Sequence, residues 1–203
     1  MKAFTKRFRG NVAGIAVDSL SSGLCPVRGR RVRLRRSTLQ DHGILGDDRR
    51  VNAGLRLRRG TGADADIAAE VYLRARHRAI PEIPPLVHSD DEVRHWMRGV
   101  LDNQEVWLAF ADHGALLGLM VLDGDWIGQL YIDPAWTGRG LGTRLLELGK
   151  QRRPDGLQLW TFVSNVRAQR FYERNGFAVE ERTDGSGNEE HAPDLRYVWR
   201  PSA

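Results

Sequence analysis

The sequence predicts a mixed α+β (α/β) fold, in which a central mixed β-sheet of about six to seven strands is flanked by about four helices. Seven short segments have the composition and alternation of strands, and four longer segments repeat apolar residues at helical spacing. The segments follow one another in the order β-α-α-β-β-β-α-β-α-β-β, so we expect helices to cover the faces of one sheet. No apolar run approaches the ~18 residues that a membrane span requires, so no membrane partner is expected.

The first half of the chain is predicted from alternation, proline and capping signals. Leu55 and Leu57 alternate with arginines, and Ile67, Val71 and Arg74 recur at helical spacing. Three prolines at 81, 84 and 85 oppose helix and favour an extended loop. Ser89 and Glu92 have the spacing of a capping box that begins a second helix. The elements expected here are a strand at 55–59, a helix at 64–78, a loop at 80–85, a helix at 89–101 with a stripe of Val93, Trp96, Met97 and Val100, and strands at 105–111 and 115–122 joined by a turn at 112–114.

The second half of the chain alternates apolar segments with glycine and proline breaks. Asp133-Pro134 ends one strand, Pro154-Asp-Gly156 ends a helix, and Asn175-Gly176 ends the next helix. The elements expected here are strands at 126–132, 157–163, 177–181 and 195–199 and helices at 142–152 and 165–174.

Charge and aromatic residues divide the 203-residue chain near residue 60. Residues 1–60 carry 15 Lys and Arg against 4 Asp and Glu, a net charge of +11, whereas residues 61–203 carry 16 against 22, a net charge of −6. All six tryptophans lie at or after Trp96. Residues 1–50 show neither strand nor helix periodicity. We therefore expect residues 1–50 to be a basic, disordered tail, or sequence that precedes the working protein, and residues 51–203 to form the domain.

Several classes of function are excluded or disfavoured. The arginine-rich run of residues 28–36 could bind nucleic acid, but such runs are common without that partner, so none is expected. The single cysteine, Cys25, excludes an internal disulfide and fits a reducing, cytoplasmic location. The six histidines lack metal-ligand spacing, so no metal is expected. The G-x-S-x-G motif of many serine hydrolases does not occur.

A glycine-rich loop lies between the strand at 126–132 and the following helix. Gly138, Gly140 and Gly142 can turn backbone N–H groups inward, and the helix N-terminus adds partial positive charge. The dinucleotide fingerprint would need glycine at Thr143, and a Walker loop would need Gly-Lys-Ser/Thr. The loop therefore indicates either a phosphate site of another kind or a plain connecting turn.

Two motifs resemble the GNAT superfamily of N-acetyltransferases. Residues 137–142, Thr-Gly-Arg-Gly-Leu-Gly, resemble its pyrophosphate loop R/Q-x-x-G-x-G/A, with Thr137 standing where Arg or Gln is usual. Residues 165–177 resemble its N-x-x-A-x-x-F-Y-x-x-x-G-F helix and turn, and residues 55–78 resemble its opening strand and helix. The resemblance covers residues 51–199 and implies a GNAT-like domain that uses acetyl-CoA as co-substrate.

The resemblance also implies roles for individual residues. Tyr172 matches the family's general acid, because a phenol can protonate the departing CoA thiolate. Phe171 would pack inward while Tyr172 lies toward the cleft, and Asn165 would contact the cofactor and cap its helix. The residues implied for acetyl-CoA are the main chain of Leu130, Tyr131 and Ile132, then Thr137, Gly138, Arg139, Gly140, Leu141, Gly142 and Thr143, and Asn165.

The acceptor and the general base stay open at this stage. Two functions remain: an N-acetyltransferase acting on a primary amine, small or peptidyl, and a non-catalytic acyl-CoA-binding or regulatory module. Homodimerisation is also open. The net charge of −6 and the acidic segment 183–190 favour a cationic or peptidyl amine, although an exposed hairpin loop also explains that segment. Trp126 and Trp160 are candidates for the cleft wall, although core packing is the ordinary role of such residues. The candidate bases, each also explicable as a surface residue, are Asp123, Asp125, Glu105 and His88.

Overall fold

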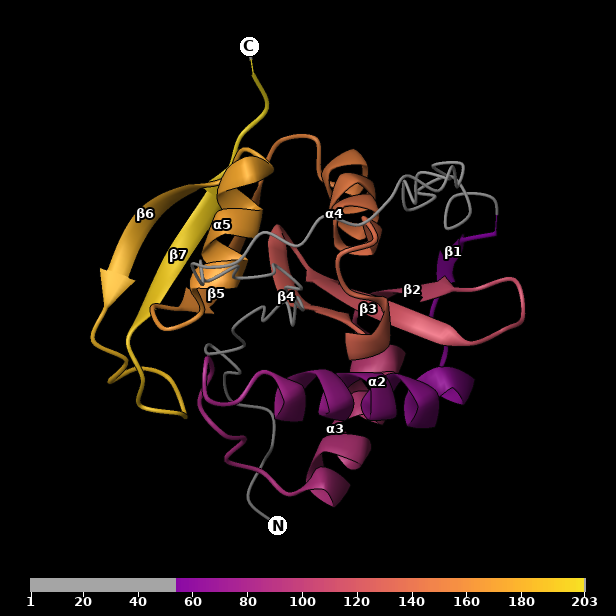
Figure 1. The fold of residues 1–203 in the computed structure, drawn as a ribbon. Helices are drawn as coiled ribbons and strands as arrows, with labels where there is room; N and C mark the ends of the chain where they lie inside the picture. The colour runs from indigo at the N-terminus through magenta and orange to yellow at the C-terminus, as the bar shows by residue number, and fades with distance from the viewer. Residues whose placement is uncertain (1–53, 203) are drawn as a thin grey trace, which may run out of the picture.

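The sheet in this computed structural model has seven strands in the order β1-β2-β3-β4-β5-β7-β6 (Figure 1). The structure describes residues 54–202, so the predicted tail at 1–50, Cys25 and the predicted start at Val51 lie outside the described residues. Strands β4 and β5 are parallel, and every other neighbouring pair is antiparallel. The strands are β1 Arg56–Arg59, β2 Glu105–Phe110, β3 Leu116–Asp123, β4 Trp126–Ile132, β5 Leu157–Phe162, β6 Ala178–Thr183 and β7 Asp194–Trp199.

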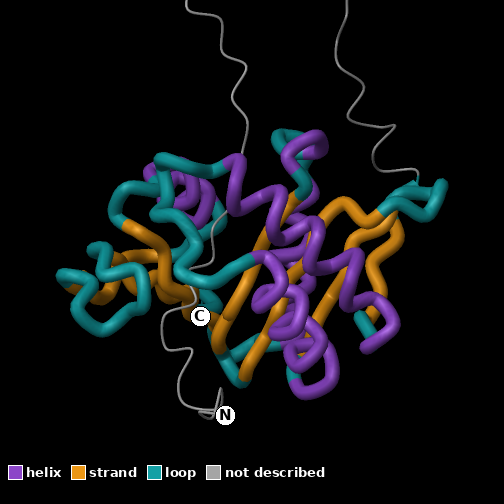
Figure 2. The backbone as a smooth tube through the Cα atoms, turned by 90° about the horizontal axis from the view of Figure 1, so that it is seen from below, coloured by secondary structure: helices purple, strands orange, loops and turns teal. Residues whose placement is uncertain are grey.

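Four α-helices of the described residues cover the sheet, two on each face. Apolar side chains of α2 and α3 pack with Val121 and Tyr131 of the sheet, whereas those of α4 and α5 pack with Leu130 and Leu159. Figure 2, seen from below, shows helices lying in front of the strands. The helices are α2 Ala65–Arg78, α3 Asp90–Asn103, α4 Leu141–Arg152 and α5 Val166–Arg174, with 3₁₀ turns η1 Gly62–Asp64 and η2 Pro134–Trp136. The predicted mixed sheet with about four helices is confirmed.

Two local predictions about the segment from α2 to α3 are wrong. Ile67 was expected on the apolar stripe of α2 but is 45% exposed, because alanines and Tyr72 form the buried side instead. The segment 80–85 is not extended throughout, since the Ile83 N–H donates to the Ala79 carbonyl at 3.0 Å and continues the turn. Proline does not prevent this turn because Ile83 itself supplies the N–H. The turn places the wholly buried Ile83 against Phe162 of β5.

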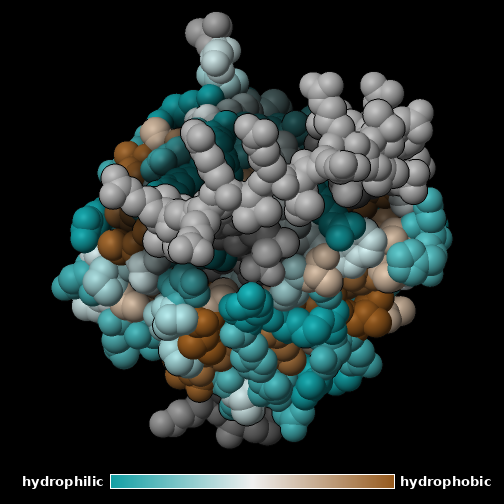
Figure 3. All heavy atoms as spheres, viewed as in Figure 1, coloured by the Kyte–Doolittle hydropathy of each residue, from teal (hydrophilic) through white to brown (hydrophobic). Residues whose placement is uncertain are grey.

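The visible surface is largely hydrophilic around smaller apolar areas (Figure 3). Among the described residues, the exposed large apolar side chains are Ile67, Ile80, Val87, Val166 and Val179. They are scattered along the chain, as is ordinary for a protein surface. Within residues 54–202, no helix combines the length and the apolar character that crossing a membrane requires.

Replacing Ser89 by alanine is expected to lower the free energy of unfolding by about 1 kcal/mol. The Ser89 hydroxyl accepts from the Glu92 N–H, and the Glu92 carboxylate accepts from the Ser89 N–H at 2.8 Å, which confirms the predicted capping box. Urea unfolding measures the change. Ser164→Ala, at an exposed turn before α5, is the control and should change the value by less than about 0.5 kcal/mol. Equal effects at the two serines would contradict a capping role.

Candidate active site

Strands β4 and β5 pair only at their beginnings, where Trp126 lies opposite Gln158. Strand β4 contains a bulge, because Val121 of β3 faces Gln129 while Leu122 faces Ile127, and bulges bend and re-aim a strand. Beyond the bulge, residues 129–132 of β4 pair with β3 but have no strand partner in β5. We call this region, residues 129–132 of β4 and 159–162 of β5, the β4–β5 split.

An unpaired strand edge offers N–H and C=O groups to an extended ligand. Leu130, Tyr131 and Ile132, whose main chains the family resemblance implies for pantetheine, all lie along the β4–β5 split. Leu130 and Ile132 pack on the α4 and α5 side, while Tyr131 packs on the α2 and α3 side. The split therefore connects the two faces of the sheet.

The glycine-rich loop has the backbone that an anion cradle needs. Gly138 and Gly140 have φ angles of 74° and 77°, in the left-handed region that favours glycine. Gly140 is the N-cap of the 12-residue helix α4, and no side chain caps the helix or places an acid in its first turn. The first N–H groups of α4, which include those of Leu141, Gly142 and Thr143, have no carbonyl partner within the helix, and the helix dipole adds positive charge there. This arrangement suits a phosphate or pyrophosphate.

Side chains around the loop hold it in place. The Arg74 guanidinium binds Asp133 at 2.6 Å, and Asp133 also accepts from the Ala135 N–H, so α2 anchors the start of the loop. The Thr137 hydroxyl donates to the Pro134 carbonyl at 3.1 Å. The Arg139 guanidinium lies 4.7 Å from the centre of the Trp136 ring. Thr137 thus stabilises the loop internally, whereas Arg139 adds a positive charge beside it.

Helix α5 places Asn165 and Tyr172 on the same side of the sheet as the cradle. Asn165 is buried, and its side-chain oxygen accepts from the Ala168 N–H at 3.1 Å, which confirms the predicted N-cap. The ring of Phe171 lies against Gly142, where an added Cβ would come within 3.4 Å of it. The beginning of α4 is therefore packed against the second half of α5.

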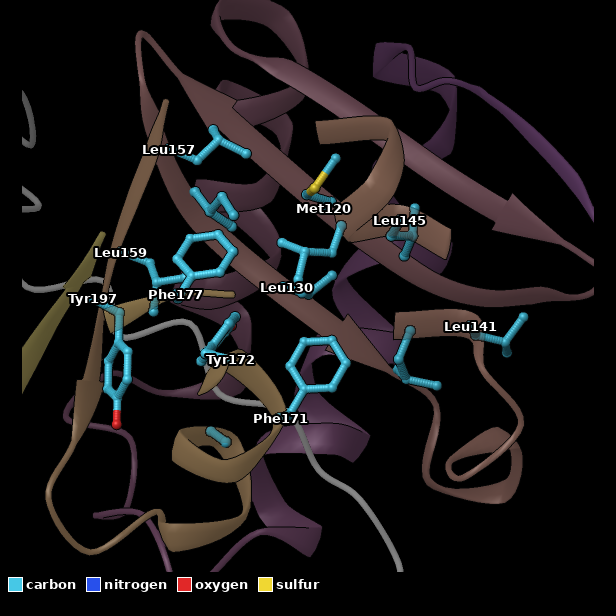
Figure 4. Packing of buried hydrophobic residues seen from close by; sticks show 14 of the residues in the cluster. Met120, Leu130, Leu141, Leu145, Leu157, Leu159, Phe171, Tyr172, Phe177 and Tyr197 are labelled. Atoms are coloured by element: carbon cyan, nitrogen blue, oxygen red, sulfur yellow. The ribbon is translucent and has the colours of Figure 1, made fainter. Parts of the chain in front are cut away.

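Tyr172 is wholly enclosed within a cluster of aromatic rings (Figure 4). Its ring contacts those of Phe171, Phe177 and Tyr197, and it is 0% exposed against 7% for Phe171. The expectation that Phe171 would be the inner of the two residues is wrong, because the α5 register turns Tyr172 into the ring cluster. Burial raises the pKa of Tyr172 well above 10, and Tyr131 raises it further. The two phenols are thus within electrostatic range, although they belong to clusters on opposite faces of the sheet.

One buried charged residue on the α2 and α3 face, Arg76, was not predicted from the sequence. Arg76 is 3% exposed, donates to Glu190 at 3.0 Å and hydrogen-bonds the side chain of Tyr131. Burial alone would lower the pKa of Arg76, and Tyr131, Tyr72 and Glu190 outweigh it and raise the pKa. The Tyr72 and Tyr131 rings are 4.8 Å apart, edge to face. No pattern in the sequence distinguishes this buried arginine from the exposed Arg74 on the same helix.

The acidic segment between β6 and β7 lies against the end of α2 and the segment that follows it. Glu190 binds Arg76, and Glu189 lies 3.1 Å from the His88 ring nitrogen. Trp126, at the start of β4, and Trp160, within β5, stack with their ring centres 6.5 Å apart. The segment and the tryptophan pair are therefore on, or next to, the face of the split opposite the cradle.

Three of the four base candidates lie away from the split. Asp123 and Asp125 are exposed at the β3–β4 turn, at the paired end of β4 and β5. Glu105 binds Arg152 and Arg153 on the surface at the start of β2. Partial burial opposes its ionisation, but hydrogen bonds from Arg153, Trp107 and Arg152 outweigh that effect and lower its pKa from 4.5 to about 2. His88 remains beside the acidic segment.

Acidification is expected to weaken the fold through Glu105. Its pKa is lower in the folded than in the unfolded chain, so its stabilisation is complete above about pH 4.5 and is lost as the pH falls toward about 2. Urea unfolding between pH 6 and pH 2 should show a smaller loss of stability in Glu105→Gln than in the unmodified protein. Identical pH dependence in the two proteins would contradict this role for the Glu105 ion pairs.

Among residues 54–202, no group of three or more His, Cys, Asp and Glu side chains has an arrangement that could hold a metal ion.

Comparisons with known proteins agree with this geometry. Residues 102–179, which include β4, the cradle and α5, match the family model of the acetyltransferase (GNAT) domain. The chain is 31% identical over 93 residues to peptidyl-lysine N-acetyltransferase YjaB of Salmonella typhimurium, and 35% identical over 138 residues to mycothiol acetyltransferase of Beutenbergia cavernae. These alignments cover 46% and 61% of this chain, and they span only 63% and 45% of the two relatives. The solution structure of apo YjaB from Escherichia coli shares the fold, with a TM-score of 0.59 at 23% identity, over 73% of this chain and 99% of that one. Residues 102–179 of this chain therefore resemble a GNAT acetyltransferase domain, within a fold that the chain shares with apo YjaB.

Proposed function

We propose that this protein transfers the acetyl group of acetyl-CoA to a primary amine by direct attack. The observation that carries the proposal is the continuity of the unpaired β4 edge with the glycine cradle at the N-terminus of α4. An extended molecule with amides along its length and a pyrophosphate at one end matches both parts. Acetyl-CoA is such a molecule, and it supplies a thioester that an amine can cleave.

The cradle, the edge of β4 and Tyr172 have separate roles in this reaction. The N–H groups at 138–143, with Arg139 beside them, hold the pyrophosphate, and the main chain at 130–132 aligns the pantetheine arm. The amine nitrogen forms a bond to the thioester carbon, the carbon–sulfur bond breaks, and the sulfur leaves with the electron pair. A phenol with an ordinary pKa of about 10 is already neutral at pH 7, and burial raises the pKa of Tyr172 further, so Tyr172 holds a proton that the thiolate can take. The amine releases one proton to water or to a base, which balances the proton given to sulfur.

The acceptor enters from the α2 and α3 face in this scheme. The cradle and α5 belong to the other face, and acetyl-CoA would lie along that side. The names of the two relatives differ, since one specifies peptidyl-lysine and the other mycothiol, so the acceptor class is argued from the site itself.

The test is release of CoA from acetyl-CoA by the full chain with a panel of primary amines. The panel should contain amino acids, peptides with lysine, polyamines and aminoglycosides. Acetylation of at least one class is the expected result, confirmed by the mass of the product. If CoA binds but no amine of the panel is acetylated, the protein is a non-catalytic acyl-CoA-binding module.

A further inference from the structure

Two buried polar side chains beside Tyr131 have hydrogen-bonding atoms without a partner. Gln129 is 1% exposed, and neither its side-chain oxygen nor its side-chain nitrogen makes a hydrogen bond. Arg76 is 3% exposed, and its Nε is likewise unpartnered. Buried polar groups of this kind cost about 1–3 kcal/mol each when unpaired, so native proteins rarely keep them without a reason.

Both side chains lie on the face from which the acceptor would come. Gln129 pairs with Val121, which belongs to the cluster under α2 and α3, and it stands two residues before Tyr131 on the same face of β4. Arg76 reaches the same place from α2 through its hydrogen bond to the Tyr131 side chain. Tyr131 in turn is within electrostatic range of Tyr172. The unpartnered atoms therefore lie beside Tyr131, in the part of β4 that borders the β4–β5 split.

The unpartnered N–H donors indicate which chemical group of a ligand could bind there. The Arg76 guanidinium contacts Glu190 through one nitrogen only, and its Nε–H is a donor still to be used. The Gln129 amide adds two more N–H donors. A guanidinium edge together with an amide suits a carboxylate, which accepts two hydrogen bonds at once.

The charges already present beside Arg76 limit the net charge that a bound ligand can carry. Arg76 and Glu190 already form a neutral pair, with side chains 3% and 13% exposed. A buried ligand with an uncompensated charge would pay a large desolvation cost, whereas a carboxylate that brings its own ammonium adds no net charge. The amine that is to be acetylated supplies that ammonium before it loses its proton.

We propose that the acceptor is an amine that also carries a carboxylate, with α-amino acids as the simplest class, and that Arg76 and Gln129 bind the carboxylate. This inference rests on the proposed acetyl transfer and specifies its acceptor. It differs from the cationic amine that the net charge of −6 favours, because the buried site and not the surface field sets recognition. The tryptophan pair at Trp126 and Trp160 lies on the same face and would flank the amino acid side chain.

The test compares each L-amino acid with its own C-terminal amide as acceptor for the full chain. The two share the amine and the side chain and differ in the carboxylate, so their ratio of kcat/KM measures carboxylate recognition. We expect the acids to be preferred by at least about 100-fold, because sites that hydrogen-bond a buried group reject analogues without it. Equal rates for acids and amides would overturn the inference while leaving the proposed acetyl transfer intact.

Variants of Gln129 and Arg76 assign the preference to residues. Gln129→Glu, of the same size, should lower the acid-to-amide ratio at least about tenfold through like-charge repulsion. Gln129→Leu should lower the ratio and raise the midpoint of thermal unfolding, since it removes the unpaired amide. Arg76→Lys keeps the charge but loses the guanidinium edge, and should also lower the ratio. Gln158→Glu on β5, where the glutamine already bonds Asp125 and Arg196, is the control and should leave the ratio unchanged.

A binding measurement keeps the two proposals separate. If no amine is acetylated, the proposed function fails, and thermal shift with CoA present then compares N-acetyl amino acids with N-acetyl amino acid amides. Stabilisation by the acids alone, lost in Gln129→Glu, would still support a carboxylate site. Equal responses to acids and amides, or none to either, would overturn it.

Discussion

Replacing Tyr172 by phenylalanine is expected to lower kcat by about 100- to 10,000-fold, the range over which a positioned acid contributes to catalysis. The substitution removes the proton that the departing thiolate takes and leaves the ring in its cluster with Phe171 and Phe177. The Kd for CoA should stay within about twofold, because the cradle and the β4 edge are unchanged. Steady-state kinetics with the best amine of the panel and calorimetry with CoA measure the two values.

Tyr197→Phe is the matched control, since Tyr197 belongs to the same ring cluster and its hydroxyl donates to Glu173 at 2.9 Å. Its loss should cost about 1 kcal/mol of stability and little activity. If the two variants lose activity equally, or if Tyr172→Phe keeps full kcat, Tyr172 is a packing residue and not the acid.

Replacing Gly140 by alanine is expected to weaken CoA binding by about 10- to 100-fold. Gly140 has a φ of 77°, and a side chain there costs roughly 1–2 kcal/mol in the left-handed region. The backbone can relieve that strain only by turning the first N–H groups of α4 away from the pyrophosphate. Hydrogen bonds to a charged group are worth about 1.5–3 kcal/mol each, which sets the size of the loss. Calorimetric titration with CoA measures it.

Gly114→Ala is the control that distinguishes damage to the anion cradle from backbone strain at a left-handed residue. Gly114 lies in the β2–β3 turn with a φ of 84°, and an added Cβ would meet no atom within 4 Å at either glycine. Both variants should lose similar stability, but only Gly140→Ala should lose affinity for CoA. Equal CoA affinities in the two variants would contradict an anion cradle at α4.

Hydrophobic periodicity, together with the residues that begin and end helices and strands, was sufficient to predict the architecture. Prolines, Asn-Gly and the capping box mark element ends through local backbone chemistry, so seven strands and four helices were expected close to where they lie. The buried side of α2 was misplaced at Ile67, because its many alanines give little apolar contrast between its sides. Local sequence also gives no sign that the Ile83 N–H reaches Ala79 past a proline.

The candidate site was predictable where it depends on local conformation and not where it depends on tertiary contact. Glycine spacing before a helix indicates the cradle directly, and the Asn165 cap follows from its place before α5. Arg76 and Gln129 gave no sequence signal, since their burial depends on how α2 crosses β4. The bulge that shifts Gln129 into register with Val121 likewise appears only when β3 and β4 are paired.

The most direct test of the account is hydrogen exchange of the full chain with and without acetyl-CoA. The central claim is that the cofactor binds along the β4–β5 split and in the cradle of α4. We expect slower exchange at residues 129–132 and 138–143 when acetyl-CoA is present, with no change in α3 on the opposite face. Protection absent from both segments, or confined to α3 and β1, would contradict it.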